Sequence, residues 1–141
     1  MFLRIAALIA LLALAGCADG DALAVSEARV RAPIPGQDKT VGYFTVHNPS
    51  DEAVTLTGAE SAAVRAIEMH TTSRDGDVVR MRRLDEVVVP AGDTVRFEPG
   101  GRHLMLFGVA ELGESVEITL TTADGQRIPV RFETVPLGAD R

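Results

Sequence analysis

The segment that decides the fold reads A-I-E-M-H-T-T-S-R-D-G-D-V-V-R-M-R-R, residues 66–83. Two runs with strand-like composition, residues 66–72 and 78–83, flank the dipeptide Asp75-Gly76. Asp-Gly between two such runs favours a type I′ hairpin turn, which needs positive φ at both central positions. The numbers of paired residues then add to 151, since 75 and 76 do. This register predicts that His70 lies directly opposite Met81.

The predicted hairpin brings two candidate metal ligands onto one face of a sheet. Directly opposed residues have Cβ atoms about 4.5–5.5 Å apart, so the His70 imidazole and the Met81 thioether should reach one ion. The same register places Glu68 opposite Arg83 as a charge pair. A slip of one residue would send His70 and Met81 to opposite faces, so the hypothesis depends on the register.

A second pair of the same residue types follows in G-G-R-H-L-M-L, residues 100–106. Residues two apart in a strand share a face, so His103 and Met105 should lie together while Leu104 points into the core. The two pairs make one set of four candidate ligands: His70, Met81, His103 and Met105.

Thioether and imidazole side chains together point to copper(I). Thioether is a soft ligand that suits Cu(I), and imidazole binds copper among several metals. Zinc sites are normally built from Cys, His or carboxylate ligands, and a blue-copper site needs a Cys beside two His. The single cysteine of the chain is Cys17, which has another predicted role. We therefore expect Cu(I) rather than zinc or a redox-cycling copper.

Other interpretations of these residues remain open. A single Met in a strand is usually core filler, and a single His is more often a surface residue or a hydrogen-bonded core residue. A structural or interaction lipoprotein without a metal role is the alternative function. The sequence contains no catalytic constellation, so an enzyme is not expected. His47 falls outside the four-ligand pattern, and Met69 should face away from His70.

The spacing His-x10-Met-x21-His-x-Met resembles the signature of the periplasmic copper chaperone family PCu(A)C. The resemblance covers about residues 25–133 and includes G-Y-F-T-V-H-N, V-P-A-G-D-T-V and P-G-G-R-H-L-M-L. It implies a cupredoxin-like fold, Cu(I) binding by the four residues, and copper delivery. The implied acceptor is the Cu(A) centre in subunit II of cytochrome c oxidase, or a thiol-bearing assembly factor. The chain lacks the Trp that the family often has near Arg29, and it has no Met/His-rich tail.

The first residues resemble a bacterial lipoprotein signal. Arg4 precedes an apolar run of 11 residues, 5–15, which is too short to span a bilayer. The run ends in L-A-G-C, similar to a lipobox, which implies cleavage after residue 16 and acylation of Cys17. An ordinary signal peptide that happens to contain a Cys is the alternative. We expect a lipid anchor as the only membrane attachment, on the periplasmic side, with inner and outer membrane both open.

The rest of the chain predicts one all-β domain. About nine or ten short strands with frequent turn signals, and no amphipathic helix, favour a single-domain Greek-key β-sandwich or barrel. The expected division is signal peptide 1–16, lipidated Cys and tether 17–24, copper-binding domain 25–135 and tail 136–141. The net charge of −6 argues against nucleic-acid binding. A monomer is expected.

One basic cluster stands out against this acidic composition. It consists of Arg74, Arg80, Arg82 and Arg83. A solvated strand face is the simpler interpretation, and a docking patch for an acidic partner is the alternative.

Overall fold

The computed structural model describes residues 21–139. The predicted signal peptide, Cys17 and residues 18–20 of the predicted tether lie outside this range, as do the last two residues of the predicted tail. The described chain is built from ten strands: β1 (Ala24–Arg31), β2 (Lys39–His47), β3 (Val54–Glu60), β4 (Ala66–Asp75), β5 (Val78–Leu84), β6 (Val87–Val89), β7 (Thr94–Phe97), β8 (Arg102–Phe107), β9 (Ser115–Thr122) and β10 (Arg127–Val135). Residues 21–139 contain no helix long and apolar enough to cross a membrane. The prediction of an all-β protein is confirmed.

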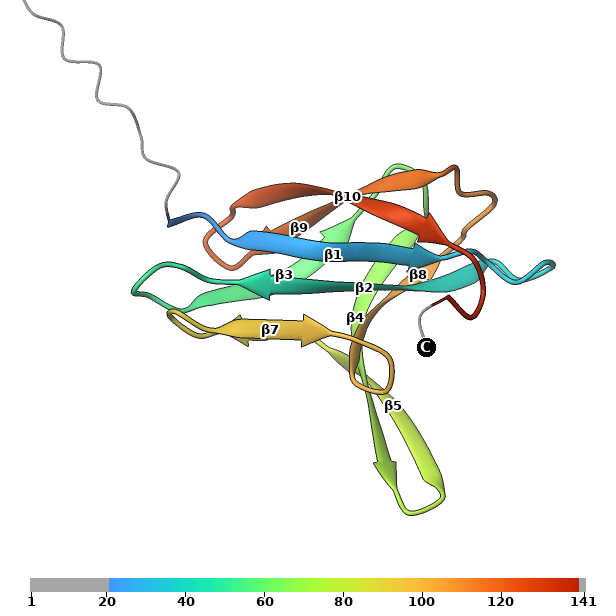
Figure 1. The fold of residues 1–141 in the computed structure, drawn as a ribbon, viewed down its shortest axis with the longest axis horizontal. Helices are drawn as coiled ribbons and strands as arrows, with labels where there is room; N and C mark the ends of the chain where they lie inside the picture. Colours follow the sequence, from blue (N-terminus) through green and yellow to red (C-terminus); the bar gives the residue numbers. More distant parts are fainter. Residues whose placement is uncertain (1–20, 140–141) are drawn as a thin grey trace, which may run out of the picture.

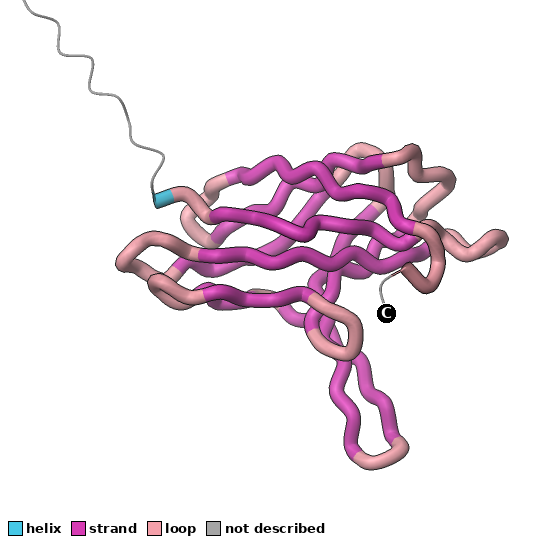
Figure 2. The backbone as a smooth tube through the Cα atoms, in the orientation of Figure 1, coloured by secondary structure: helices cyan, strands magenta, loops and turns pink. Residues whose placement is uncertain are grey.

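The strands form one continuous sheet that folds over on itself (Figures 1 and 2). Their order is β5-β4-β8-β2-β1-β10-β9-β3-β6, with β7 paired to β2 off this path. Neighbouring strands are antiparallel except for β1 and β10, which pair in parallel. The first and last strands of the chain are therefore side by side near the middle of the sheet.

The core lies inside this folded sheet and contains aromatic rings from three strands. Phe44 of β2 stacks on Phe97 of β7 with ring centroids 4.3 Å apart, and meets Phe132 of β10 edge-on at 5.8 Å. Leu104 and Leu106 of β8 are fully buried beside them, as the alternation in that strand predicted. Burial of these large side chains is the main source of stability, because no disulfide is possible within a chain that has one cysteine.

The β4–β5 hairpin leaves the body of the molecule as a projecting arm, here defined as residues 72–83 (Figure 1). Every residue of β5 except Leu84 is exposed. β5 is also the end of the sheet order, so its outer edge has no neighbouring strand within the described residues.

The predicted register of this hairpin is wrong by two residues. Asp75 pairs with Val78, so the two-residue loop is Gly76-Asp77 rather than Asp75-Gly76. Of the two loop residues, Gly76 alone has positive φ, 59°, as in a type II′ turn with Gly first. The segment Asp75-Gly76-Asp77 allows either turn, because Gly76 can be the second central residue of an Asp75-Gly76 turn or the first central residue of a Gly76-Asp77 turn.

Candidate metal centre

The adjacent strands β4 and β8 bring the two predicted histidines together. His70 and His103 are directly paired across the strands, and their ring centroids are 5.8 Å apart. His70 is only 9% exposed and His103 only 5%. Both point away from the core face, on which Met69 and Leu104 form the next pair.

Met105 lies on the same outward face as His103, two residues further along β8. It is half-buried and stands opposite Glu68 of β4. Its side chain also lines a cavity of about 170 Å³ that it shares with Val41 and Arg31. The structure therefore places His70, His103 and Met105 in one neighbourhood on the body of the molecule.

Met81 occupies a different environment from the other three. It pairs with Thr72, and the residue opposite His70 is Arg83, so the predicted direct pairing of His70 with Met81 is wrong. A shift of two residues keeps the face unchanged, so Met81 remains on the outward face as a diagonal neighbour of His70. Its side chain is 53% exposed on the arm.

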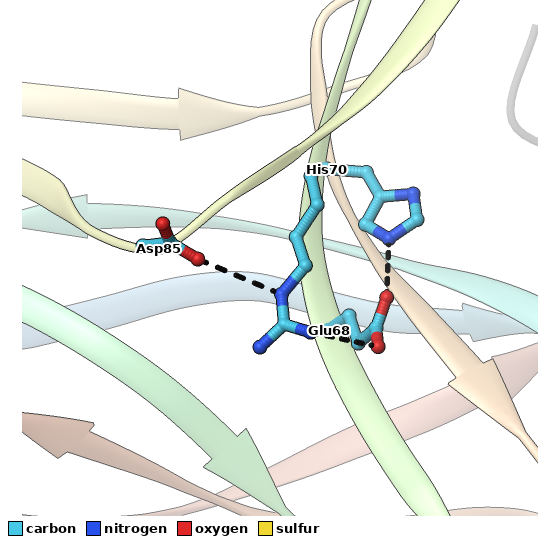
Figure 3. A network of polar contacts seen from close by, with 4 residues as sticks. Glu68, His70 and Asp85 are labelled. Atoms are coloured by element: carbon cyan, nitrogen blue, oxygen red, sulfur yellow. Dashed lines mark hydrogen bonds and ion pairs between the residues drawn. The ribbon is translucent and has the colours of Figure 1, made fainter.

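Glu68 fixes the orientation of the His70 ring. The His70 Nε2 lies 2.8 Å from a Glu68 carboxylate oxygen (Figure 3). An ionised carboxylate only accepts hydrogen bonds, so Nε2 carries the proton and donates it. In neutral His70 the free lone pair is then on Nδ1. That atom is buried and has no hydrogen-bond partner among the described residues.

Arg83 and Asp85 complete this polar network. Arg83 donates to the other Glu68 oxygen at 3.2 Å and lies 3.7 Å from Asp85 (Figure 3). The predicted contact between Glu68 and Arg83 is confirmed, although the two residues are diagonal rather than opposed. The hydrogen bond from His70, together with the charge of Arg83, holds the pKa of Glu68 below its usual value despite partial burial. Glu68 is therefore a carboxylate at neutral pH.

His103 is oriented by a backbone carbonyl. Its Nδ1 lies 3.2 Å from the Gly101 oxygen, and a carbonyl only accepts, so Nδ1 donates and the lone pair is on Nε2. Burial lowers the pKa of His103, as does the charge of nearby His70, while the Gly101 hydrogen bond opposes them. The ring is therefore held neutral with one nitrogen free for a ligand.

Two imidazole lone pairs and nearby thioether sulfurs are what this face offers a metal. Within residues 21–139, no group of three or more His, Cys, Asp or Glu side chains is placed to hold a metal ion. Met105 and Met81, on the same outward face, are the candidates for further donors to a metal between His70 and His103. Such a neutral set of donors suits a soft, singly charged ion.

The role of Glu68 was missed by sequence reasoning about ligands. Glu and His two residues apart in a strand share a face, so E-x-H within residues 66–72 was the available signal. Met69 is buried in the core, in agreement with the prediction that it faces away. His47 is hydrogen-bonded through Nδ1 to the Thr94 hydroxyl at 3.0 Å, on a different pair of strands.

Comparison with protein families and curated relatives gives a consistent assignment. Residues 23–134 match the model of the LpqE-like family, described as "Putative lipoprotein LpqE-like". The protein named "Putative lipoprotein Lxx21020" of Leifsonia xyli subsp. xyli is 31% identical over 136 residues, which cover 85% of this chain and 81% of that protein.

Solved structures with the same fold are copper-related domains. The apo form of DR1885 from Deinococcus radiodurans is 28% identical, with a TM-score of 0.64 over 100% of this chain and 97% of that one. CuI-DR1885 is 26% identical, with a TM-score of 0.63 over 91% and 85%. The copper-bound PCuAC domain from PmoF2 is 23% identical and superposes with a TM-score of 0.69 over 81% and 92%. The cupredoxin-like fold and the resemblance to PCu(A)C domains are confirmed.

Proposed function

Because the chain belongs to the LpqE-like lipoprotein family, we propose that it is a lipid-anchored Cu(I) chaperone. It binds copper as cargo on the outward face of β4 and β8 and passes the ion to a partner protein. The ligands are the two imidazoles and the two thioethers: His70, Met81, His103 and Met105.

The observation that carries this proposal is the arrangement of the two imidazoles. His70 and His103 are directly opposed, and each donates one ring N–H to a fixed acceptor. Each ring therefore keeps one lone pair, and the His70 Nδ1 is buried with no partner in the described chain. An unsatisfied buried polar atom costs about 1–3 kcal/mol. A bound cation would remove that cost.

The two thioethers complete the group of four ligands and determine which metal ion the site prefers. Neutral sulfur and nitrogen donors favour Cu(I) over hard dications. The Glu68 carboxylate accepts hydrogen bonds from His70 and Arg83. It would therefore influence a bound metal through the His70 ring and not as a direct ligand. DR1885, which has a related sequence and fold, has been solved in a form named CuI-DR1885.

The different exposure of the ligands supports release by stepwise exchange. Met81 is the most accessible of the four, whereas His70 and His103 are buried. A partner's thiolate or imidazole would replace Met81 first and then the ligands nearer the body. Copper would pass between the proteins without being released as a free ion.

The anchor and the acceptor are finer parts of the same proposal. Acylation of Cys17 would hold the domain at the periplasmic side of a bacterial membrane. The acceptor that the PCu(A)C resemblance implies is the Cu(A) site of cytochrome c oxidase or a thiol-bearing assembly factor. We propose no enzymatic activity.

The test is anaerobic Cu(I) titration of the purified protein against a competing chelator. The parent should bind one ion tightly, and a Met81→Leu/Met105→Leu variant should lose that binding. A Met69→Leu variant is the matched control, because Met69 is a core residue and Leu conserves its volume. Weak binding by the parent, or tight binding kept by the double variant, would favour a structural lipoprotein without a metal role.

A further inference from the structure

The arm and the adjoining end of β8 carry a concentration of unpaired positive charge in an acidic protein. Arg80 and Arg82 on β5 and Arg102 on β8 are all exposed. None of their guanidinium groups forms an ion pair or hydrogen bond with another residue in the range 21–139. Arg83, by contrast, is bound to Glu68 and Asp85. Of the basic cluster seen in the sequence, Arg83 is structural and Arg80 and Arg82 are free. Arg74 pairs with Val79 on the opposite face, and Arg102 joins the free arginines from β8.

The three free arginines share one face of the ribbon, which we call the arginine face. Thr71 of β4 pairs with Arg82 on one side and with Arg102 on the other, and Ser73 pairs with Arg80. Residues in such rows point the same way. Val78, which is 51% exposed, continues this face toward the tip. Asp75, opposite Val78, is the acidic residue at the end of it.

The arginine face is on the opposite side of the hairpin from Met81, and the two sides meet at the outer edge of β5. Side chains alternate along β5, so Arg80 and Arg82 flank Met81 in the sequence and point to the other side of the same edge strand. The outer edge of β5 is unpaired in the described structure. A protein segment lying along that edge would therefore touch both the arginines and Met81.

We propose that the outer edge of β5, with the arginine face, is the docking site for an acidic segment of the protein that exchanges copper with this one. This inference rests on the proposed function. Arginine binds carboxylates through paired hydrogen bonds, and exposed apolar residues beside arginines are typical of protein interfaces. In a protein with a net charge of −6, the arginine face is a local positive region that would direct an acidic segment to this edge rather than to the rest of the surface.

The test uses ¹⁵N-labelled protein and two synthetic extended peptides, one alternating Glu with Val and one alternating Lys with Val. At low salt the Glu peptide should shift the amide signals of β5, and the Lys peptide should not. An Arg80→Glu/Arg82→Glu variant should bind the Glu peptide at least about tenfold more weakly. The matched control is Arg65→Glu/Arg131→Glu, which makes the same charge change at exposed arginines outside the arm and should change affinity less than about twofold.

Three results would overturn the docking site. One is the absence of peptide binding, and another is an equal loss of binding in the control variant. The third is arginine-dependent binding only to phosphatidylglycerol vesicles, which would assign the face to a membrane. Cu(I) titration of the same proteins keeps the two hypotheses separate. The Arg80→Glu/Arg82→Glu variant should bind Cu(I) as the parent does. A parent protein without Cu(I) affinity would contradict the proposed function, whether or not the Glu peptide binds.

Discussion

The hydrogen bond between Glu68 and His70 determines which nitrogen of the imidazole is available. Replacing Glu68 with Ala leaves the His70 Nε2–H without its 2.8 Å acceptor, so the ring is free to rotate and to change tautomer. We expect Cu(I) affinity to fall about 10–100-fold, the usual effect of losing such an orienting partner. Glu68→Gln should recover most of the affinity, because its amide oxygen also accepts from Nε2–H.

Chelator competition measures the affinity, and the ¹⁵N shifts of the His70 ring report the tautomer directly. A Thr94→Ala variant is the control, since it removes the hydroxyl partner of His47 away from the site. Unchanged ring shifts and unchanged affinity in Glu68→Ala would remove the positioning role.

The pKa of His103 predicts how the copper-free protein responds to mild acid. Its pKa is lowered in the folded state, mainly by burial, while a free imidazole titrates near 6.5. Between those values the unfolded chain binds more protons, so the free energy of unfolding falls as pH drops below about 6.5. The slope from one such group cannot exceed about 1.4 kcal/mol per pH unit.

Urea unfolding at about pH 7.5 and about pH 5.5 measures this difference. The contribution should be absent from His103→Gln. A His103→Gln variant with the same loss of stability over this range would assign the pH dependence to other groups.

At the scale of elements, the arm should contribute to copper binding while contributing little to folding. Met81 is half exposed and has no place in the core, so Met81→Leu should change the free energy of unfolding by no more than about 0.5 kcal/mol. Loss of the thioether should nevertheless weaken Cu(I) binding at least about tenfold, roughly 1.4 kcal/mol of binding free energy.

The matched control moves the sulfur instead of removing it. Val79 lies on the same face as Met81, two residue pairs closer to the tip. A Met81→Leu/Val79→Met variant should keep the weak affinity of Met81→Leu, because the thioether is then too far from His70. Full recovery would mean that the position of the sulfur along the arm is unimportant.

The strands were largely predictable from the sequence, because turn residues and alternation mark them locally. Strands at residues 87–89 and 94–97 flank Pro90-Ala91-Gly92-Asp93, a segment that leaves one place for the turn. The D-G-D segment instead allows two turns, and local chemistry does not choose between them. The contact of His70 with His103 could not be derived locally either, because it depends on the pairing of β4 with β8 across the chain.

At the scale of the whole molecule, attachment to the membrane should depend on Cys17. Cys17→Ser removes the only thiol that could be acylated, so the variant should move from the membrane fraction to the soluble periplasmic fraction. Ala18→Ser is the neighbouring control and should stay with the membrane. A Cys17→Ser protein that remains in the membrane fraction would contradict the lipid anchor. Cell fractionation followed by immunoblotting measures this.

The parallel pairing of β1 with β10 also determines when the protein can fold. Arg29 pairs with Glu133 and Arg31 with Val135, so the central strand β1 gains its second neighbour only after residues 127–135 have been synthesised. Contacts this distant in the chain make folding slow. Until residues 127–135 are present, β1 and β9 have open edges and Phe132 is missing from the core. Folding must therefore wait until residues 127–135 have been synthesised, and a chain that stops before β10 has an interrupted sheet with which to resist proteolysis.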